Sequence, residues 1–338
     1  MAGLTIQDIQ QKLTDAGAKE KHLALFWRQL LAGQKPQSTR KIRFPKAVEA
    51  LIPEILNEID RLLNVEEAVA DSSGSERLVL RLSDGEVIEA VLLPKEGLCL
   101  STQVGCAVGC KFCMTGKGGL RRQLSDLEIL TQLIVARKKR EVHKVVFMGM
   151  GEPSHNLRAV LSALDWMATY GQIGYKELVL STVGDRRLFE ELKTRQIKPA
   201  LALSLHSAFD QKRRDLLPHA KDIPVEEILA FTKEYAQLTH YPVQFQWTLI
   251  DGVNDGEDEI QQLGKIWKDQ FAVLNMIPVN SVEGTGFKRP APERLEEIAE
   301  ELKSKRILVK YRNSAAQEVE GGCGQLRARF LKSEKASS

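Results

Sequence analysis

The sequence has no long run of apolar residues and little excess of either charge. No stretch approaches the roughly eighteen consecutive apolar residues that suggest a membrane-spanning helix. The N-terminal residues MAGLTIQDIQQKLTDAG lack the basic and then apolar layout of a signal peptide. We therefore expect a cytoplasmic protein that does not contact a membrane. The formal net charge of +3 also means that the chain as a whole is not a polycation.

Cysteine is scarce as well. The chain has 338 residues and five cysteines: Cys99, Cys106, Cys110, Cys113 and Cys323. An odd number of cysteines in a reducing compartment argues against a disulfide scaffold and favours metal or redox chemistry. The hydrophobic share of 43% and the charged share of 28% are ordinary for a globular protein.

The basic residues cluster even though the total charge is nearly balanced. Such blocks suit a polyanion such as RNA. Composition alone nevertheless favours the plainer interpretation, that these are solvated surfaces. The clusters are Arg28, Lys35, Arg40, Lys41, Arg43 and Lys46; Lys111, Lys117, Arg121 and Arg122; Arg137, Lys138, Lys139 and Arg140; and Arg327, Arg329 and Lys332.

The first part of the chain predicts helices followed by a hairpin. Residues 1–70 are expected to be helical, because apolar residues between Val48 and Leu63 recur at helical spacing. The polar stretch 71–75 predicts a domain boundary. Two apolar stretches then flank Ser83-Asp84-Gly85, which is typical of a β-hairpin turn. We therefore expect a small helical N-terminal domain over 1–70 and a β-hairpin linker over 75–95.

From Cys99 onward, short apolar strands alternate with amphipathic stretches such as 127–140 and 160–170. This alternation predicts an α/β fold with a parallel sheet and crossover helices, over residues 96–330. Six units would form an open sheet or an incomplete barrel, with ligands at the carboxyl ends of the strands. Residues 331–338 are expected to be a disordered tail. The expected strands are 98–104, 144–150, 177–182, 200–205, 243–250 and 273–279.

Three cysteines, Cys106, Cys110 and Cys113, follow the first of these strands at a spacing of three and two intervening residues. Three thiolates so close together can wrap one face of an iron–sulfur cubane and leave the fourth iron open to a small bidentate ligand. Structural clusters and structural zinc sites usually close all four positions. A zinc site with Cys99 or a distant histidine as fourth ligand, or a chance spacing, are the alternatives.

Four segments occur in a fixed order along the chain: LCLSTQVGCAVGCKFCMTG, VVFMGMGEP, SLH and GGCGQL. The cysteine spacing resembles that of the radical S-adenosylmethionine (radical SAM) superfamily. Together the four segments resemble the RlmN/Cfr family of RNA adenine methyltransferases, over roughly residues 75–330. This resemblance implies a partial (βα)6 radical SAM barrel, a 4Fe–4S cluster on Cys106, Cys110 and Cys113, and S-adenosylmethionine cleaved to a 5′-deoxyadenosyl radical. It also implies a ribosomal or transfer RNA substrate and an electron donor such as flavodoxin. We expect a monomer.

The resemblance also implies which residues bind S-adenosylmethionine, with Phe112 packing over its adenine. Taken without the resemblance, 148–153 is a simple strand-to-helix turn in which Glu152 is a helix-start acid. A lone histidine such as His206 is likewise more often structural. The implied cofactor-binding residues are Gly151, Glu152, Ser181, Ser204, Leu205, His206 and Asn280.

Cys323 lies in a glycine-rich stretch, Gly321-Gly322-Cys323-Gly324, which favours a mobile loop over a packed core. The resemblance implies that one S-adenosylmethionine methylates Cys323 and that cleavage of a second turns the methyl group into a radical. That radical would add to ring carbon C2 or C8 of adenine. Cys99 would then release the product through a transient disulfide with Cys323, and Glu89 would accept the ring proton. The alternating pattern around Glu89 favours a solvent-facing hairpin residue instead.

Three segments depart from the family pattern: 154–156, 281–287 and 317–322. They are expected to line the substrate entrance, so the radical chemistry is carried over more firmly than the RNA target. Given this chemistry, we expect RNA contact by Lys117, Arg121, Arg122 and the N-terminal basic segment. The alternatives are a radical SAM enzyme acting on a protein or a small molecule, and a non-enzymatic metal-binding RNA protein.

Overall fold

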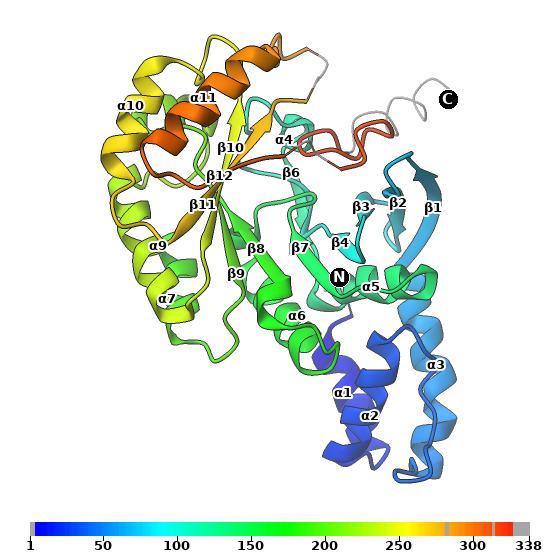
Figure 1. The fold of residues 1–338 in the computed structure, drawn as a ribbon. Helices are drawn as coiled ribbons and strands as arrows, with labels where there is room; N and C mark the ends of the chain where they lie inside the picture. Colours follow the sequence, from blue (N-terminus) through cyan, green and yellow to red (C-terminus); the bar gives the residue numbers. More distant parts are fainter. Residues whose placement is uncertain (1–3, 281–283, 313–314, 327–338) are drawn as a thin grey trace.

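The computed structural model describes residues 4–280, 284–312 and 315–326, and a ten-stranded sheet runs through its centre (Figure 1). The strands follow one another across the sheet in chain order, apart from two that form a separate small sheet. In spatial order they are β1 (Leu63–Ala70), β2 (Glu76–Leu82), β3 (Val87–Leu93), β4 (Gly97–Cys99), β7 (Lys144–Phe147), β8 (Leu178–Thr182), β9 (Ala200–Ser204), β10 (Val243–Leu249), β11 (Ala272–Pro278) and β12 (Val309–Tyr311).

From β4 to β12 every neighbouring pair of strands is parallel, whereas β1 to β4 pair antiparallel. A helix connects each parallel strand to the next, as parallel pairing requires. In the described ranges β1 does not pair with β12, so the sheet stays open. The predicted α/β fold with a partial barrel of six units is therefore confirmed. The main crossover helices are α5 (Asp126–Lys139), α6 (Leu157–Thr169), α7 (Arg186–Thr194), α9 (Val225–Thr239), α10 (Glu257–Ile266) and α11 (Pro292–Ser304).

The sheet has an outer and an inner side. Helices α7, α9, α10 and α11 lie on the outer side in Figure 1, and the red C-terminal segment 315–326 lies on the other. This segment closes over the hairpin strands, because a β-carbon on Gly321 would lie 3.3 Å from Val91 Cγ2 and 3.4 Å from Arg77 Cβ. The end of the chain is thereby brought over strands more than two hundred residues earlier.

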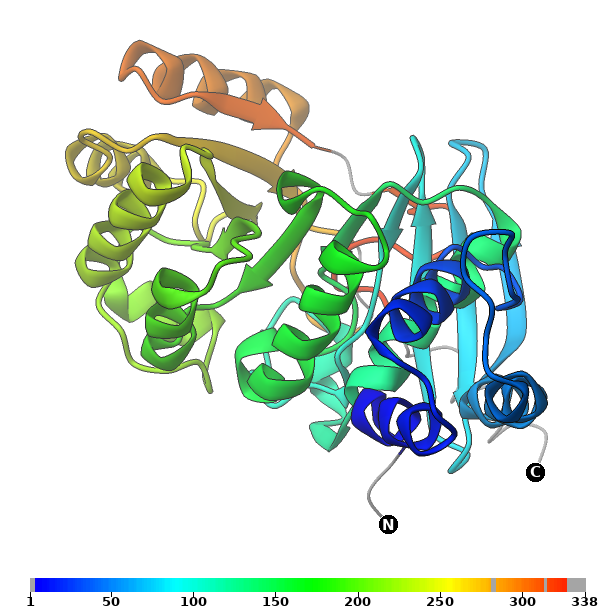
Figure 2. The same ribbon diagram turned by 90° about the horizontal axis from the view of Figure 1, so that it is seen from below.

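The N-terminal residues form three helices, α1 (Ile6–Asp15), α2 (Glu20–Leu31) and α3 (Lys46–Leu62). A capping box between Thr5 and Asp8 begins the first helix. The three helices lie beside α5 (Figure 2), where Arg137 Nη1 donates to the carbonyls of Leu31 and Gly171, 2.8 Å from each. A hydrogen bond to the last residue of α2 therefore connects this helical group to α5, the first crossover helix of the sheet.

The prediction of helix as far as residue 70 is wrong for its last eight residues. Leu63–Ala70 form β1, the edge strand of the sheet, paired antiparallel with β2. Helix propensity is a weak preference, and here the open hydrogen-bonding edge of β2 overrides it. The expected hairpin does form from β2 and β3, with Gly85 at φ 85° in its turn, but it is an integral part of the main sheet.

The expected single strand over 98–104 is also wrong, because the chain forms two short strands there. β4 belongs to the main sheet, whereas β5 (Gln103–Gly105) pairs with β6 (Leu120–Gln123) in a separate two-stranded sheet. Between them, the buried Ser101 hydroxyl donates to the carbonyl of Glu89 at 2.6 Å and so turns the chain out of the main sheet.

None of the helices in the described ranges is long and apolar enough to cross a membrane. The tail predicted for residues 331–338 lies outside the described residues, as do Arg327, Arg329 and Lys332.

Candidate active site

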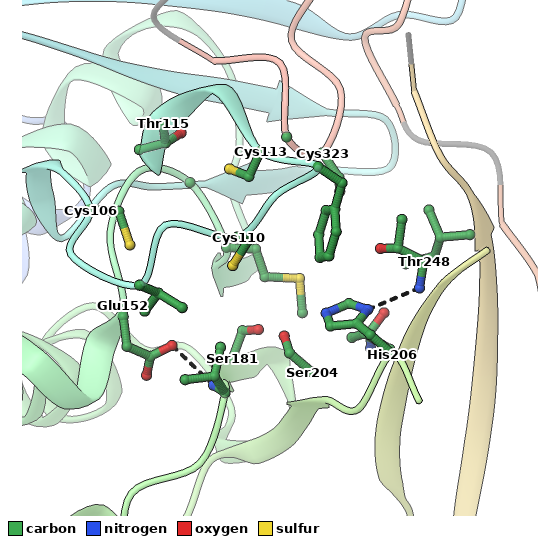
Figure 3. A pocket seen from close by; sticks show the side chains of 18 of the residues that line it. Cys106, Cys110, Cys113, Thr115, Glu152, Ser181, Ser204, His206, Thr248 and Cys323 are labelled. Carbon is green, nitrogen blue, oxygen red and sulfur yellow. Dashed lines mark hydrogen bonds between the residues drawn. The ribbon is translucent and has the colours of Figure 1, made fainter. Parts of the chain in front are cut away.

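A cavity of about 160 Å³ lies at the carboxyl ends of the parallel strands, where ligands bind in open α/β sheets (Figure 3). The loop that follows β5 forms one wall, and the ends of β7 to β11 form the others. Residues far apart in the chain meet here. They include Cys106, Cys110, Phe112, Cys113, Gly151, Glu152, Ser181, Ser204, His206, Asn280 and Cys323.

The three motif cysteines share this cavity, and their spacing suits a cluster better than a single ion. In the described part of the chain, their sulfur atoms do not all lie within 4.8 Å of one another. Thiolates around one tetrahedral zinc ion would be about 3.8 Å apart, given Zn–S bonds of about 2.3 Å. Thiolates that bind different irons of a cubane are farther apart. The spacing therefore disfavours a single zinc ion and is compatible with a 4Fe–4S cluster.

Burial raises the pKa of all the thiols for which a shift is evident. The pKa of Cys106 rises to about 12 through burial, with Glu152 and Cys113 adding to the effect. The pKa of Cys110 is raised well above its ordinary value for the same reasons. Thiolates must be deprotonated to bind a metal, so iron would replace these protons when the cluster assembles.

The cysteine loop is fastened to the turn after α8 (Asp210–Leu216). The Lys111 amide donates to the Leu216 carbonyl at 3.0 Å, and the His219 amide donates to the Val108 carbonyl at 3.1 Å. Gly109 adopts φ 65°, and a β-carbon there would lie 3.1 Å from the ring of His219. This close approach requires glycine, so the short motif depends on a segment a hundred residues later in the chain.

Glu152 projects into the cavity from the segment after β7. Its Oε1 accepts hydrogen bonds from Thr182 Oγ1 at 2.6 Å and the Ser154 amide at 3.0 Å, and its Oε2 accepts one from the Val183 amide at 3.0 Å. The preceding Gly151 has φ 106°, and a β-carbon there would lie 2.6 Å from Gln103 Cγ. The carboxylate is thus held rigidly, with glycine letting the two strand ends approach.

His206 ends the segment after β9 in a left-handed conformation, with φ 59°. Its Nδ1 accepts a hydrogen bond from the Thr248 amide at 3.0 Å (Figure 3), so the neutral ring carries its proton on Nε2. Burial, reinforced by the Arg213 charge, lowers its pKa to about 3. The ring meets Phe112 edge to face at 4.8 Å. A neutral donor beside an aromatic wall is therefore available to a ligand.

Ser181 and Ser204 line the cavity from the ends of β8 and β9, whereas Leu205 does not. The Leu205 side chain is fully buried in the hydrophobic core, and its amide donates to the Gln246 carbonyl. In this structure, Leu205 contributes to the site through the course of the backbone alone.

The C-terminal loop reaches the cavity from the other side and is hydrogen bonded to it at two points. Asn280 Nδ2 donates to the Cys323 carbonyl at 2.9 Å, and the Met114 amide donates to the Gly324 carbonyl at 2.7 Å. Gly324 has φ 82°, and a β-carbon there would lie 2.9 Å from the Phe112 carbonyl oxygen. The exposed Cys323 is thus held beside the cysteine motif.

A second cavity of about 160 Å³ adjoins the first and contains both Cys99 and Cys323 in its walls. Cys113 and Gly149 line both cavities. Burial and the nearby Cys323 thiol raise the pKa of Cys99 well above its ordinary value. Neither Cys99 nor Cys323 is in a disulfide. The structure therefore brings these two thiols to one space without joining them.

Glu89 lies on β3 and does not line either cavity. Its side chain is 1% exposed, so the solvent-facing alternative suggested by the sequence pattern is wrong. Arg77 Nη1 lies 2.7 Å from Glu89 Oε1 in an ion pair that is largely buried. Arg77 also packs beneath Gly321, which places this pair under the loop that carries Cys323.

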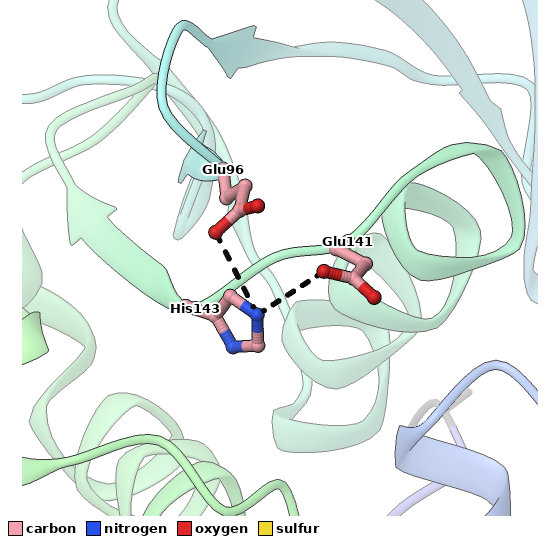
Figure 4. A group of neighbouring side chains, drawn as sticks. All are labelled: Glu96, Glu141 and His143. Atoms are coloured by element: carbon pink, nitrogen blue, oxygen red, sulfur yellow. Dashed lines mark ion pairs between the residues drawn. The ribbon is translucent and has the colours of Figure 1, made fainter.

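A different group of potential ligands lies on the surface. His143 Nε2 is 3.6 Å from Glu96 Oε2 and 3.4 Å from Glu141 Oε2 (Figure 4). All three side chains are more than half exposed, so water competes for any ion bound there. They line neither cavity, and the cysteine motif stays the candidate metal centre.

Several residues of the site were not predicted from the sequence. Gln246 and Thr248 line the cavity from β10, and Thr182 holds Glu152. The available signal for the first pair was the alternation of polar and apolar residues along this strand, which has Gln244, Gln246 and Thr248 on one face. Arg213 approaches from α8, and nothing in its local sequence distinguishes it from the neighbouring Arg214.

The comparisons with known proteins agree with this geometry. Residues 100–263 match the model of the radical SAM superfamily. A "probable RNA methyltransferase" of Bordetella avium is 49% identical over 331 residues, covering 96% of this chain and 94% of the relative. One from Pseudomonas aeruginosa PAO1 is 48% identical over 328 residues, covering 96% and 95%. A radical SAM methyltransferase from Sphaerobacter thermophilus has a similar structure, with a TM-score of 0.82, 29% identity and coverage of 96% and 98%.

Proposed function

This chain belongs to the radical SAM RNA methyltransferases, and on that basis we propose that it methylates a ring carbon of adenine, C2 or C8, in ribosomal or transfer RNA. The observation that carries the proposal is the position of Cys323. A radical initiator needs no further thiol, yet Asn280 and Met114 hydrogen bond the Cys323 loop beside the three motif cysteines. A cysteine so placed is suited to carry the transferred carbon.

The cofactors are a 4Fe–4S cluster and S-adenosylmethionine, which together supply a 5′-deoxyadenosyl radical when bound. Cys106, Cys110 and Cys113 would hold the cluster. Glu152 would form an ion pair with the ammonium group of S-adenosylmethionine. Because three hydrogen-bond donors already fix this carboxylate, its side chain would lose little conformational entropy on binding. His206 would donate from Nε2, and Gly151, Ser181, Ser204, Leu205 and Asn280 would shape the remaining contacts.

The other two cysteines divide the later steps between them. Cys323 would receive a methyl group and present it, as a thioether, to the adenine ring. Cys99 would then form a disulfide with Cys323 and so release the methylated base, and the shared cavity supports this pairing. Glu89 would accept the ring proton after a movement of the Cys323 loop, since in this structure it lies beneath that loop, ion-paired with Arg77.

Residues 1–70 would act as an RNA-binding accessory domain. All six basic residues between Arg28 and Lys46 are exposed, and none forms an ion pair within the described ranges. By contrast, Arg122 is paired with Asp84 and Glu128, and Arg137 donates to backbone carbonyls. The N-terminal segment therefore offers more available positive charge to phosphates than the cluster at 137–140.

We infer that the enzyme works as a monomer and takes electrons from a donor such as flavodoxin.

The test combines product analysis with a single variant. The anaerobically loaded enzyme is incubated with methyl-labelled S-adenosylmethionine, a reductant and total RNA, and we expect 5′-deoxyadenosine together with 2- or 8-methyladenosine. Cys323→Ala should still bind the cluster and make no methyladenosine. Methylated RNA from that variant would refute the methylcysteine route. Labelled protein or small molecules, with RNA unlabelled, would favour a radical SAM enzyme with another substrate.

A second variant tests the release step. Cys99→Ala leaves Cys323 without its proposed partner, so covalent protein–RNA species should accumulate on denaturing gels. Cys99→Ala that turns over without any such species would show that another group releases the product.

A further inference from the structure

Arg213 lies on the buried face of α8, together with Leu216 and Leu217. These two leucines belong to the apolar cluster in which Cys106 and Cys110 are partly buried. At the end of the same helix, the Leu216 carbonyl accepts a hydrogen bond from the Lys111 amide. Arg213 is therefore one helical turn from the segment that supports the cysteine loop.

One nitrogen of the Arg213 guanidinium is held by two backbone carbonyls. Nη2 donates to the carbonyl of Val183, and to that of Ser204 at 3.3 Å, at the ends of β8 and β9. Both residues line the cavity, which Arg213 itself does not. Its Nε is buried without a hydrogen-bond partner, and no carboxylate forms an ion pair with Arg213 among the described residues. Its charge is thus buried and not neutralised by a contact.

Among the described residues, Arg289 also bonds two lining residues, Val279 and Asn280, but it is exposed, whereas Arg213 is buried. Among the described residues that line the cavity, Glu152 is the one carboxylate and none is a lysine or an arginine. The imidazole of His206 is neutral, since its pKa is lowered to about 3. Burial lowers the pKa of Arg213 to about 10, so it remains a cation at neutral pH, and Asp210, Cys110 and Glu152 act to raise it. Since the Leu216 carbonyl, one turn along α8, accepts a hydrogen bond from the amide of Lys111, the residue after Cys110, the Arg213 cation lies close to a cluster ligand.

We propose that Arg213 is a positioning residue whose buried charge raises the reduction potential of the 4Fe–4S cluster bound by Cys106, Cys110 and Cys113. In the redox step, one electron from an external low-potential reductant converts the oxidised [4Fe–4S]2+ cluster to [4Fe–4S]+, with no proton transferred. The three thiolates already make this unit negative, and the electron adds a further charge in a dry environment. A nearby fixed cation stabilises the reduced form more than the oxidised form. The proposal rests on the cluster and is independent of the RNA target.

The adjacent Arg214 offers a matched control. It is half-exposed and lies 3.2 Å from Asp222 on the outer side of α8, where water and salt screen its charge. Arg213→Gln and Arg214→Gln thus remove the same charge one residue apart. Arg213→Lys keeps the charge but replaces the planar guanidinium, whose Nη2 donates to both carbonyls.

The experiment is an anaerobic redox titration of the full-length loaded proteins without S-adenosylmethionine, followed by the EPR signal of the reduced cluster. At the ambient potential that half-reduces the native cluster, Arg213→Gln should show a ratio of reduced to oxidised cluster at least tenfold lower. Tenfold corresponds to about 59 mV for one electron. Arg213→Lys and Arg214→Gln should stay within threefold of the native ratio, with iron and sulfide content checked in each protein.

Two results would overturn the proposal. One is a fully loaded Arg213→Gln whose ratio stays within threefold of native. The other is an equal tenfold loss in Arg213→Lys, which would assign the effect to the lost carbonyl contacts and not to charge. If Arg213→Gln takes up no cluster, Arg213→Met, which also removes the charge, is titrated in its place: a tenfold lower ratio supports the proposal, and a ratio within threefold overturns it.

Discussion

Glu152→Gln should weaken both the fold and the binding of S-adenosylmethionine. The substitution keeps the shape of the side chain but replaces one carboxylate oxygen by an NH2 group. Oε1 serves two donors and Oε2 one, so the least damaging orientation places the NH2 against the Val183 amide. One charge-assisted hydrogen bond is then lost and one buried N–H is left without an acceptor. We expect a loss of about 2 kcal/mol in the free energy of unfolding.

The effect on the cofactor is separate from that on stability. A neutral amide would no longer attract the ammonium group of S-adenosylmethionine, so the Kd should rise about 10- to 100-fold, where each factor of ten is about 1.4 kcal/mol. Equilibrium dialysis of the loaded enzyme with labelled S-adenosylmethionine measures this Kd. Urea denaturation of the same preparation, followed by circular dichroism, measures the change in stability.

Glu128→Gln is the matched control. Glu128 is also buried and accepts three hydrogen bonds, from both Nη atoms of Arg122 at 2.9 Å and the Ser125 amide at 2.8 Å, but it does not line the cavity. The Glu128→Gln protein should lose a comparable free energy of unfolding, while its Kd for S-adenosylmethionine stays within about twofold of the native value. A Glu152→Gln protein that binds S-adenosylmethionine as tightly as the native enzyme would refute the assignment of Glu152 to the ammonium group.

Three further predictions follow from the same geometry. Because the folded pKa of His206 is about 3 and the unfolded value is about 6.5, stability should fall as the pH drops below 6.5, by about 2 kcal/mol between pH 7 and pH 5; urea titrations of His206→Asn should lack this component. Gly151→Ala should abolish binding of S-adenosylmethionine, since its β-carbon would lie 2.6 Å from Gln103 Cγ, whereas Gly118→Ala, with nothing within 4 Å, should bind normally in the same dialysis assay. Removing Lys41 and Arg43 should lower RNA affinity and reduce the slope of log K against log salt by about one per cation, and an unchanged slope would exclude this segment from the interface.

Much of the parallel sheet could be predicted from the sequence. β8, β9, β10 and β11 lie within one or two residues of the expected strands. β8, β9 and β11 are mainly apolar, as parallel strands buried on both faces are, and β10 shows the alternation of a strand with one polar face. The failures have tertiary causes. Leu63–Ala70 directly follows a stretch with helical spacing yet pairs with the edge of β2. The stretch 98–104 is divided because Ser101 bonds the backbone of β3 and β5 leaves the main sheet.

The sequence by itself determined the radical chemistry, because that chemistry resides in local spacing: Cys106, Cys110 and Cys113 are close together in any fold that exposes their loop. Their relation to the rest of the chain was decided only by tertiary structure. The meeting of Cys99 with Cys323, the burial of Glu89 against Arg77, and the hydrogen bond of Lys111 to Leu216 join residues that are 224, 12 and 105 positions apart. Sequence patterns report which face of an element is apolar, but long-range packing selects which faces meet, and so which thiol or charge reaches the cluster.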